Sequence, residues 1–411
     1  MSLPTPTPFR IAVPDDLLAF ISDRVRTGRL PTALHHEEGG GWSHGLPVET
    51  LSTLQKFWTS EYDWRTIEAR LNATFKQFTL PISAEGEDLS IHFVHHRSTR
   101  QDAIPLLFVH GWPGSFLEVE NILPLLTEPA SPKHQAFHVV APSLPGFGFS
   151  SAPKNAGFTP KKIAVVLNKL MLSLGYSTYI AQGGDWGSLI SRFMGVNHPE
   201  SCVGIHVNFL VATPPSPLWN PLEVAWLVLR RFTEPEKEKL KRMMWWREKE
   251  GGYFQIMGTK PMTVSYALVD SPLGMLAWIR EKLELLVDGH TWTNEQCITW
   301  AMMYIIPGGV APANLYKEGF DTLQVELLDH IIGPSVYFGS SSFPKDVGYV
   351  PIWWARCKIA KNIVFWAEHE KGGHFASVEN PEILVGDIRG FVEKIQGATW
   401  AGLIKAGAGD I

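Results

Sequence analysis

Hydrophobic and polar residues recur along this chain with two different periods, and the change from one to the other divides the chain into segments. Before residue 95, apolar positions recur at helical spacing in three stretches, which predict helices over about 15–25, 49–62 and 67–75. Two short alternating runs follow, at 78–82 and 89–94, and predict a hairpin that turns at Glu85-Gly86-Glu87.

From residue 104 the pattern changes to strands separated by loops and helices. Each expected strand is a short apolar run, as in strands that are buried on both faces of a parallel sheet. The expected strands are 104–109, 137–141, 178–181, 203–207, 336–339 and 362–367. Between 212 and 334 only helical patterns occur, over 222–232, 234–250, 273–287 and 294–305. We therefore predict an α/β fold with a mainly parallel sheet and an inserted helical cap.

These changes of pattern predict five segments. Residues 1–95 form a helical lead-in, 96–211 the first part of the α/β core, 212–334 the cap, 335–400 the second part of the core, and 401–411 a tail. A helical insertion of this kind is expected to cover the carboxyl ends of the parallel strands, where open sheets bind their ligands.

Composition and charge narrow the classes of partner. The chain is 45% hydrophobic and 19% charged, which is typical of a globular protein with a large core. A net charge of −5 gives no reason to expect nucleic acid or an anionic membrane as a partner. The three cysteines are too scattered for a disulfide framework or a zinc site. With no recognisable signal peptide or membrane-length apolar run, we expect a soluble, cytoplasmic protein without a membrane anchor.

Residues 179–188, Tyr-Ile-Ala-Gln-Gly-Gly-Asp-Trp-Gly-Ser, carry the most specific signal. An apolar strand enters a Gly-x-Asp-x-Gly turn, and a helical segment follows. This spacing is typical of the nucleophile elbow of α/β-hydrolases, a strained strand-to-helix turn that exposes one reactive side chain. The reactive position holds Asp185 instead of serine. Because a carboxylate that attacks a saturated carbon forms an alkyl ester, we expect an epoxide or a haloalkane as the substrate.

The α/β-hydrolase triad runs along the chain in the order nucleophile, acid, histidine. Asp185, Asp346 and His374 follow this order, and the last two come after expected strands. Glu368 and Glu370 also follow a late strand and are alternative acids. The oxyanion donors are expected to be two backbone N–H groups, that of Trp186, directly after the nucleophile, and that of Trp112 in an early loop.

Three motifs in order, His110-Gly111-Trp112-Pro113-Gly114-Ser115, Gly183-Gly184-Asp185-Trp186-Gly187-Ser188 and Gly372-Gly373-His374-Phe375, resemble microsomal-type epoxide hydrolases, in particular the soluble fungal members. The lead-in segments Asp63-Trp64-Arg65 and Glu68-Ala69-Arg70-Leu71-Asn72 are similar to the N-terminal region peculiar to that group. The likeness runs from about residue 8 to residue 395.

The resemblance implies that Asp185 attacks an epoxide carbon to give an ester and an alkoxide. It also implies that two cap tyrosines, matched here by Tyr253 and Tyr316, donate hydrogen bonds to the epoxide oxygen. A phenol has a pKa near 10, so it stabilises an alkoxide and yet stays protonated at neutral pH. Tyr266 and Tyr304 are the alternatives to Tyr316, and we expect both to be core residues of cap helices.

In the second step the resemblance implies that His374, oriented by Asp346, activates water to attack the ester while Trp112 and Trp186 hold the oxyanion. The product is a vicinal diol. We expect a small apolar epoxide and water as the only small-molecule partners, with no cofactor and no metal. A homodimer is compatible with the resemblance.

Three other functions stay open from the sequence. A haloalkane dehalogenase shares the aspartate followed by tryptophan, but needs neither paired cap tyrosines nor the lead-in. A biosynthetic cyclase would keep the tyrosines and use a hydroxyl of the substrate in place of water. A silent binding protein should have lost a triad member, and none is missing.

We interpret the other conspicuous clusters as parts of the structure without a role in catalysis or metal binding. His35-His36-Glu37-Glu38 lacks ordered metal-ligand spacing. The histidines 92, 95 and 96 fall on a strand and are expected to be surface or hydrogen-bonded residues. Met243-Met244-Trp245-Trp246 is expected to pack in the cap core, and Gly146-Phe147-Gly148 to line the nucleophile side of the pocket.

Overall fold

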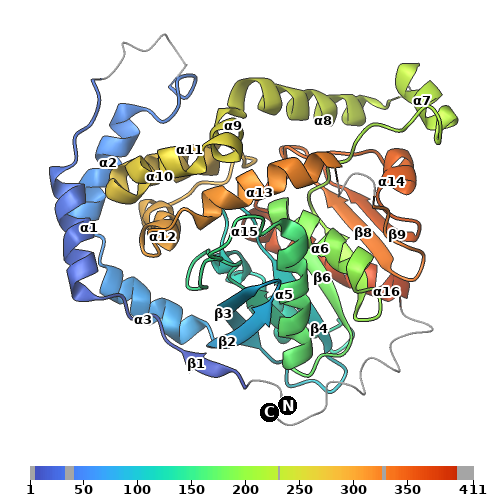
Figure 1. Cartoon of the computed structure of the whole chain (residues 1–411), viewed down its shortest axis with the longest axis horizontal. Coiled ribbons are helices and arrows are strands. Elements are labelled where there is room, and N and C mark those ends of the chain that lie inside the picture. Colours follow the sequence, from blue (N-terminus) through green and yellow to red (C-terminus); the bar gives the residue numbers. More distant parts are fainter. Residues whose placement is uncertain (1–4, 33–40, 230–231, 326–329, 396–411) are drawn as a thin grey trace.

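The computed structural model describes residues 5–32, 41–229, 232–325 and 330–395 of the 411-residue chain. These residues form a nine-stranded sheet with helices on both faces and a layer of further helices across its upper edge (Figure 1). The strands are β1 (Thr7–Phe9), β2 (Gln77–Ala84), β3 (Glu87–His96), β4 (Ile104–Val109), β5 (Phe137–Pro142), β6 (Tyr179–Gly183), β7 (Cys202–Val207), β8 (Tyr337–Ser342) and β9 (Ile363–Glu368).

The sheet is mostly parallel, as predicted. Its strand order is β1-β2-β3-β5-β4-β6-β7-β8-β9. The pairs from β1 to β5 are antiparallel, and every pair from β5 to β9 is parallel. All residues of β4, β6 and β7 are buried, which explains why these strands are continuous apolar runs. The short edge strand β1 was not predicted, because prolines flank and interrupt it.

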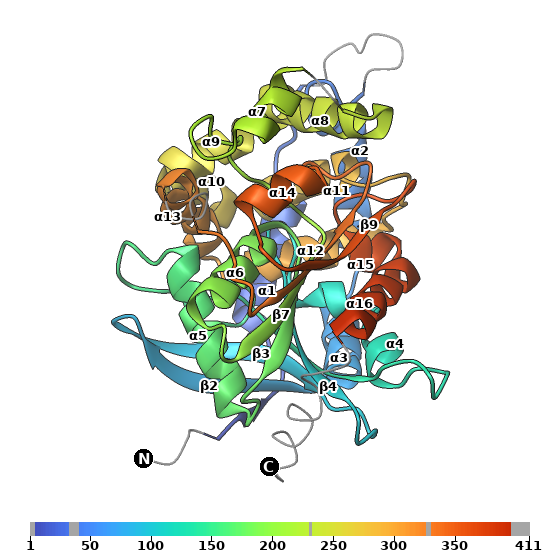
Figure 2. The same cartoon turned by 90° about the vertical axis from the view of Figure 1, so that its right-hand side faces the viewer.

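Two pairs of helices cover the two faces of the sheet (Figure 2). Helices α5 (Pro160–Ser173) and α6 (Asp185–Asn197) pack on one face, and α4 (Leu123–Thr127) and α16 (Pro381–Ile395) pack on the other. Arg389 of α16 donates to the carbonyl oxygens of Leu125, at 2.6 Å, and Gln135, at 3.2 Å. The shorter elements η1 (Phe116–Val119), α14 (Ile352–Lys358) and α15 (Ala376–Glu379) lie in loops near the carboxyl ends of the strands.

The lead-in contains the three expected helices, α1 (Asp15–Thr27), α2 (Val48–Ser60) and α3 (Trp64–Thr74). Helix α3 fixes the preceding segment by side-chain hydrogen bonds to its backbone. The Asn72 amide accepts from the N–H of Ile11 and donates to its carbonyl, both at 2.8 Å. Glu68 accepts from the N–H of Val13 at 2.7 Å. Arg65 donates to the Val13 carbonyl at 2.8 Å, so residues of both lead-in motifs attach the N-terminal segment to α3.

Between β7 and β8 the structure is helical, as expected. The helices are α7 (Pro221–Val228), α8 (Glu234–Trp245), the π-helix η2 (Trp246–Glu250), α9 (Gly252–Thr259), α10 (Pro261–Asp270), α11 (Pro272–Leu285), α12 (Asn294–Ile305) and α13 (Ala311–Val325). The helix expected over 234–250 is present with these bounds, and its last part, from Trp246, is a π-helix that continues α8. Helices α9, α10 and α13 were not predicted. α9 begins at Gly252 and α10 at Pro261, so glycine and proline masked the helical pattern.

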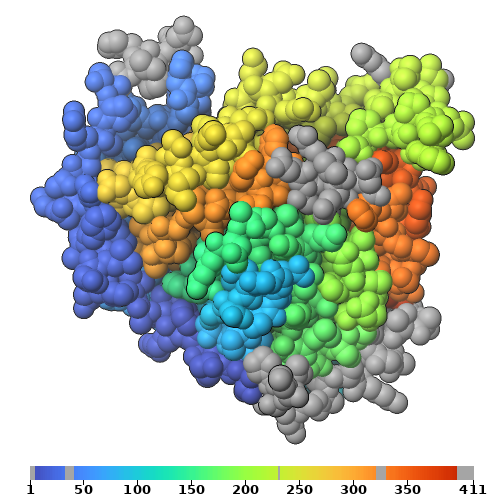
Figure 3. Space-filling view, viewed as in Figure 1, coloured from blue at the N-terminus to red at the C-terminus, as the bar shows by residue number. Residues whose placement is uncertain are grey.

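The lead-in contacts the cap as well as the sheet. The Tyr62 hydroxyl lies 3.1 Å from the Thr299 hydroxyl of α12. At the end of α1, a Cβ on Gly28 would collide with the Leu273 side chain of α11. Figure 3 shows the lead-in residues, in blue, directly against the yellow and orange cap helices.

Within the described residues, no single helix is long and apolar enough to cross a bilayer, and the pair α10 and α11, which passes such a test together, bends by 115° between its halves. Cys202, Cys297 and Cys357 are buried free thiols. The expected segment boundaries, the cytoplasmic location and the homodimer stay predictions, and the 401–411 tail lies outside the described residues.

Candidate active site

Asp185 lies at the turn between β6 and α6, as the elbow motif predicts. Its φ of 48° is in the left-handed region, which is strained for a residue with a Cβ. The turn is possible because Gly187 lies against the Val109 and His110 carbonyl oxygens, where any Cβ would collide. The strained turn presents the carboxylate at the carboxyl edge of the sheet.

One oxygen of this carboxylate is held by the loop after β4. The N–H of Trp112 donates to Oδ1 of Asp185 at 2.8 Å. A Cβ on Gly111 would collide with the same carboxylate, so glycine lets the loop approach. Burial raises the pKa of Asp185, and the His374 charge and the backbone N–H groups of Trp112 and Trp186 oppose that rise. The two expected oxyanion donors therefore both act on the Asp185 carboxylate.

The other oxygen faces His374. Oδ2 of Asp185 lies 3.6 Å from Nε2 of His374, and Nδ1 of His374 lies 2.7 Å from Oδ1 of Asp346. The backbone N–H of His374 donates to the Leu286 carbonyl at 2.8 Å, which fixes its loop against the cap. Burial alone would lower the pKa of His374, but the carboxylates of Asp346, Asp185 and Glu118 raise it to about 9. The structure thus brings together the three residues that the chain order predicted, with His374 between Asp185 and Asp346.

The alternative acids lie elsewhere. Glu368 accepts from Lys239 and from the Tyr349 hydroxyl, each at 3.1 Å. Glu370 is exposed. Asp346 is the carboxylate that contacts His374.

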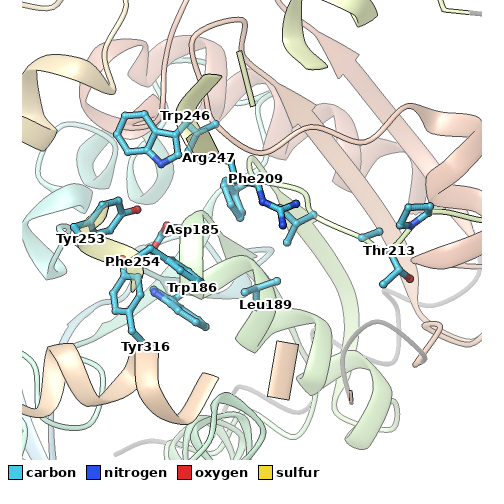
Figure 4. A pocket seen from close by; sticks show the side chains of 14 residues that line it. Asp185, Trp186, Leu189, Phe209, Thr213, Trp246, Arg247, Tyr253, Phe254 and Tyr316 are labelled. Carbon is cyan, nitrogen blue, oxygen red and sulfur yellow. The ribbon is translucent and has the colours of Figure 1, made fainter. Parts of the chain in front are cut away.

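Tyr253 of α9 and Tyr316 of α13 extend from the cap toward Asp185 (Figure 4). The Tyr253 ring stacks on Trp112 with centroids 5.0 Å apart, and the Tyr316 ring meets Trp186 edge-on, also at 5.0 Å. Burial raises the pKa of both phenols, and the Asp185 charge acts in the same direction. The buried Tyr316 hydroxyl has no hydrogen-bond partner among the described residues. An unpaired buried hydroxyl is free to donate to a ligand.

The two alternative tyrosines do not lie in this position. Tyr304 is buried, as expected, and donates to the Gly114 carbonyl at 2.5 Å. Tyr266 is 75% exposed, so the expectation that it packs in the cap core is wrong. It lies on α10, where the apolar side chains of Met262 and Val269 are exposed as well.

A cavity of about 420 Å³ connects the nucleophile and the tyrosines. Most of its lining is apolar or aromatic, and Figure 4 shows Asp185 with both tyrosines at one end and Thr213 at the other. The lining residues are Asp185, Trp186, Leu189, Phe209, Val211, Ala212, Thr213, Pro214, Trp246, Arg247, Tyr253, Phe254, Tyr316 and Val347. A pocket of this kind suits a small apolar ligand.

Two structural expectations near the site need correction. Trp246 of the Met-Met-Trp-Trp run lines the cavity, whereas Met244 is 57% exposed, so the run does not pack as one core segment. Phe147 is buried against the rings of His110 and Tyr304 and is not among the cavity-lining residues.

The strand histidines behave as expected: His92 is buried, and its ring nitrogens lie 2.9 and 3.0 Å from Ser143 and Gln77.

Glu118 was not predicted from the sequence as a residue of the site. It lies on η1, and its carboxyl occupies the space beside Gly114, where a Cβ would collide with it. Burial raises the pKa of Glu118 to about 8; the His374 charge opposes this rise, and the Asp185 charge adds to it. The only signal in the sequence was an acidic residue within the otherwise apolar run Phe116-Leu117-Glu118-Val119.

Among the described residues, no group of three or more histidine, cysteine and acidic side chains is arranged to hold a metal ion. The His35-His36-Glu37-Glu38 cluster lies outside the described residues. The expectation that the protein needs no metal and no cofactor stays a prediction.

Comparison with known proteins agrees with the geometry. A family model described as the epoxide hydrolase N terminus matches residues 6–119, and one described as the alpha/beta hydrolase fold matches residues 104–229. Epoxide hydrolase 1 of Sus scrofa is 33% identical over 420 residues, which cover 94% of this chain and 88% of that protein.

Solved structures give the same result. The epoxide hydrolase of Aspergillus niger has 35% identity and a TM-score of 0.83, covering 96% of this chain and 97% of that one. The juvenile hormone epoxide hydrolase of Bombyx mori has 30% identity and a TM-score of 0.85, covering 96% and 95%. With this likeness along almost its whole length, the chain is an α/β-hydrolase-fold enzyme and belongs to the epoxide hydrolase family.

Proposed function

We propose that this enzyme opens an epoxide to a vicinal diol in two steps, through a covalent ester on Asp185. The proposal rests on one observation, that the two carboxylate oxygens of Asp185 make different contacts. Oδ1 accepts from the Trp112 N–H at 2.8 Å, whereas Oδ2 lies 3.6 Å from Nε2 of His374, and the Asp185 side chain borders the cavity. One oxygen is therefore held by the protein, and the other is available to attack.

In the first step Oδ2 of Asp185 attacks an epoxide carbon, and the C–O bond of the ring breaks. The electron pair of that bond goes to the ring oxygen, which takes a proton from Tyr253 or Tyr316. A bare alkoxide is a very poor leaving group, so this proton donation lowers the barrier. The raised pKa of each phenol keeps it protonated at neutral pH until the substrate oxygen gains charge.

In the second step water attacks the ester carbonyl carbon, and His374 takes its proton. The hydrogen bond from Nδ1 of His374 to Asp346 fixes the tautomer that leaves Nε2 free to act as a base. Esterification removes the negative charge of Asp185, which is one of the charges that raise the pKa of His374. The histidine thus becomes easier to deprotonate at the stage that needs it.

During this attack negative charge develops on Oδ1 of Asp185, which already accepts from Trp112. The N–H of Trp186 is the second donor. Removing one such preorganised donor typically costs about 3–4 kcal/mol of transition-state stabilisation. When the tetrahedral intermediate collapses, the bond from the former ester carbonyl carbon to the alcohol oxygen breaks, and that oxygen takes the proton held by His374, so that the diol leaves. The second proton of the water passes to the tyrosinate left by the first step, which restores both the phenol and the Asp185 carboxylate.

The mechanism predicts the source of the oxygen in the diol. In a single turnover with excess enzyme in heavy-oxygen water, the first diol should carry unlabelled oxygen from Asp185, and the label should enter the Asp185 carboxylate. Peptide mass analysis of the enzyme and mass analysis of the diol read out both. Label in the first diol without label in Asp185 would contradict the ester. A cyclised product without solvent oxygen would identify a cyclase instead.

A further inference from the structure

The cap buries a lysine, Lys282, beside one of its two phenols. Lys282 lies on α11, and its side chain is only 3% exposed. Ile279, three residues earlier, and Leu286, four residues later, are buried on the same side of the chain. A lysine is almost never buried unless it is paired, because removing an ammonium from water costs free energy. The partner of Lys282 is Glu281, 3.1 Å away, whose side chain is 21% exposed.

The ammonium of Lys282 lies against two aromatic rings. Its Nζ is 4.7 Å from the Tyr253 ring centroid and 5.4 Å from that of Trp246. Both rings line the cavity, whereas Lys282 is not a lining residue and does not itself contact a ligand there. Among the described residues, no cation lies over the ring of Tyr316, the other phenol. The two phenols therefore differ in their electrostatic surroundings.

This difference becomes important when a phenol loses its proton. A cation is attracted to the face of a neutral phenol ring, and the full negative charge of a tyrosinate attracts it more strongly. An opposite charge within about 4–6 Å typically lowers the pKa of an acid by about 1–3. Burial raises the pKa of Tyr253, and the carboxylates of Asp185 and Glu281 add to that rise. Ester formation removes the charge of Asp185, so the ammonium of Lys282 then acts against one carboxylate fewer.

We propose that Lys282 selects Tyr253 as the phenol that transfers its proton to the epoxide oxygen, while Tyr316 donates a hydrogen bond and keeps its proton. This inference rests on the proposed function, because it concerns the proton that ring opening consumes. As the C–O bond of the ring breaks, its electron pair goes to the ring oxygen, which takes the proton of Tyr253. The negative charge stays on Tyr253 beside Lys282 until a proton of the hydrolytic water restores the phenol. Lys282 keeps its own protons and acts through Tyr253, so it is a positioning residue.

Two substitutions distinguish this role from that of a structural ion pair. Lys282→Met removes the charge and keeps most of the apolar stem, whereas Glu281→Gln removes the partner and leaves the ammonium. An ion pair that only holds the cap together should make both variants lose activity in the same way. If the ammonium stabilises the tyrosinate, Lys282→Met should slow ring opening by about 10-fold, and Lys282→Arg should restore most of the rate. Glu281→Gln should not slow this step.

A double-mutant cycle identifies the phenol on which Lys282 acts. Single-turnover stopped-flow measurements of tryptophan fluorescence separate ring opening from ester hydrolysis. In Tyr253→Phe, adding Lys282→Met should change ring opening by less than about twofold, whereas in Tyr316→Phe it should slow ring opening by about 10-fold or more. Ester hydrolysis should stay unchanged in Lys282→Met, which shows that the site is still assembled. An equal loss in the two backgrounds, or in Lys282→Met and Glu281→Gln, overturns the inference.

The pKa of Tyr253 tests the inference without turnover. A fluorinated tyrosine, whose phenol is more acidic, replaces Tyr253 or Tyr316, and fluorine NMR follows its titration. Lys282→Met should raise the pKa at position 253 by at least about 1 and change the pKa at position 316 much less. The same pKa at position 253 with and without the ammonium overturns the inference. If that pKa shifts as expected but the wild type opens no epoxide, the proposed function fails instead.

Discussion

Nδ1 of His374 lies 2.7 Å from Oδ1 of Asp346, and both side chains are buried. The carboxylate also accepts from the N–H of Val347 at 2.6 Å, which fixes it in its loop. This pairing makes the side of the imidazole that faces Asp185 an acceptor whenever the ring is neutral. The arrangement gives the site a definite protonation pattern, and several predictions depend on it.

Asp346→Asn should lower kcat by about 10³- to 10⁴-fold, because an amide at this position favours the wrong tautomer of His374. Steady-state kinetics with a neutral epoxide measure the loss. Glu370→Gln is the control. Glu370 is an exposed acid shortly before His374 in the chain, and its replacement should leave kcat unchanged. Near-normal turnover by Asp346→Asn would exclude Asp346 as the orienting acid.

His374→Gln should stop the reaction at the ester. Ring opening does not need the histidine as a base, whereas ester hydrolysis does. Intact-mass analysis after mixing with an epoxide should show the enzyme heavier by the mass of the substrate. Asp185→Ala should show neither the mass increase nor turnover. A His374 variant that turns over at the normal rate would mean that another group activates water.

Replacing either Tyr253 or Tyr316 by Phe should slow ring opening by about 100-fold and leave ester hydrolysis unchanged, because each phenol donates to the epoxide oxygen only in the first step. Stopped-flow measurement of tryptophan fluorescence separates the two steps. Tyr266→Phe is the control on a solvent-exposed cap tyrosine. Full activity of the Tyr253→Phe, Tyr316→Phe double variant would refute the role of the pair.

The pKa values also predict how stability depends on pH. His374 has a pKa of about 9 in the folded protein, compared with 6.5 for an ordinary histidine. Its contribution to stability is therefore complete below about pH 6.5 and is lost as the pH rises through about 9. Urea unfolding across this range should show a falling free energy of unfolding, and His374→Gln should flatten the fall.

Glu118 adds a loss of stability in a lower range. Its pKa is about 8 in the folded protein, compared with 4.5 for an ordinary glutamate, so the folded state disfavours the charged form. Stability should fall as the pH rises from about 4.5 to about 8, and Glu118→Gln should remove this component. The two variants have different windows, so a set of unfolding curves at several pH values separates them. An unchanged pH profile in both would show that neither group titrates as described.

Asn72→Ala should destabilise the fold without changing the chemistry. It removes both hydrogen bonds to the Ile11 backbone, at a cost of about 1–3 kcal/mol. Urea unfolding should show the loss, and kcat at low temperature should stay near that of the wild type. An unaltered unfolding free energy would mean that the N-terminal segment is held by its apolar contacts alone.

The sequence predicted the parallel strands well, and the three residues that it proposed as a triad lie together in the fold, for physical reasons. Strands such as Ile104–Val109 are apolar at every position because helices cover both faces. The elbow residues are recognisable because Gly187 must approach Val109 closely, which restricts the turn to few sequences. Chain order then left few acids and one glycine-flanked histidine for the other two positions.

The features that escaped prediction depend on contacts between segments far apart in the chain. Helix α9 starts with glycine and is stabilised by packing on α13, as in the pair Phe254 and Phe320, whose centroids are 5.6 Å apart. The π-helix at Trp246 continues a regular helical pattern, and local propensity does not mark it. Glu118 is 256 residues before His374, and only the folded chain brings their charges close together.

The N-terminal helices touch the cap through Tyr62 and Gly28, and the segment before them is attached to α3 through Asn72. We expect these contacts to help hold the cap, and with it the phenols of Tyr253 and Tyr316, in position relative to Asp185, although the N-terminal helices contribute no atom to the chemistry. Shortening or loosening these helices should therefore change the reactive geometry from more than a hundred residues away. Engineers who redesign the cap for new substrates therefore have to conserve the first helices as carefully as the pocket.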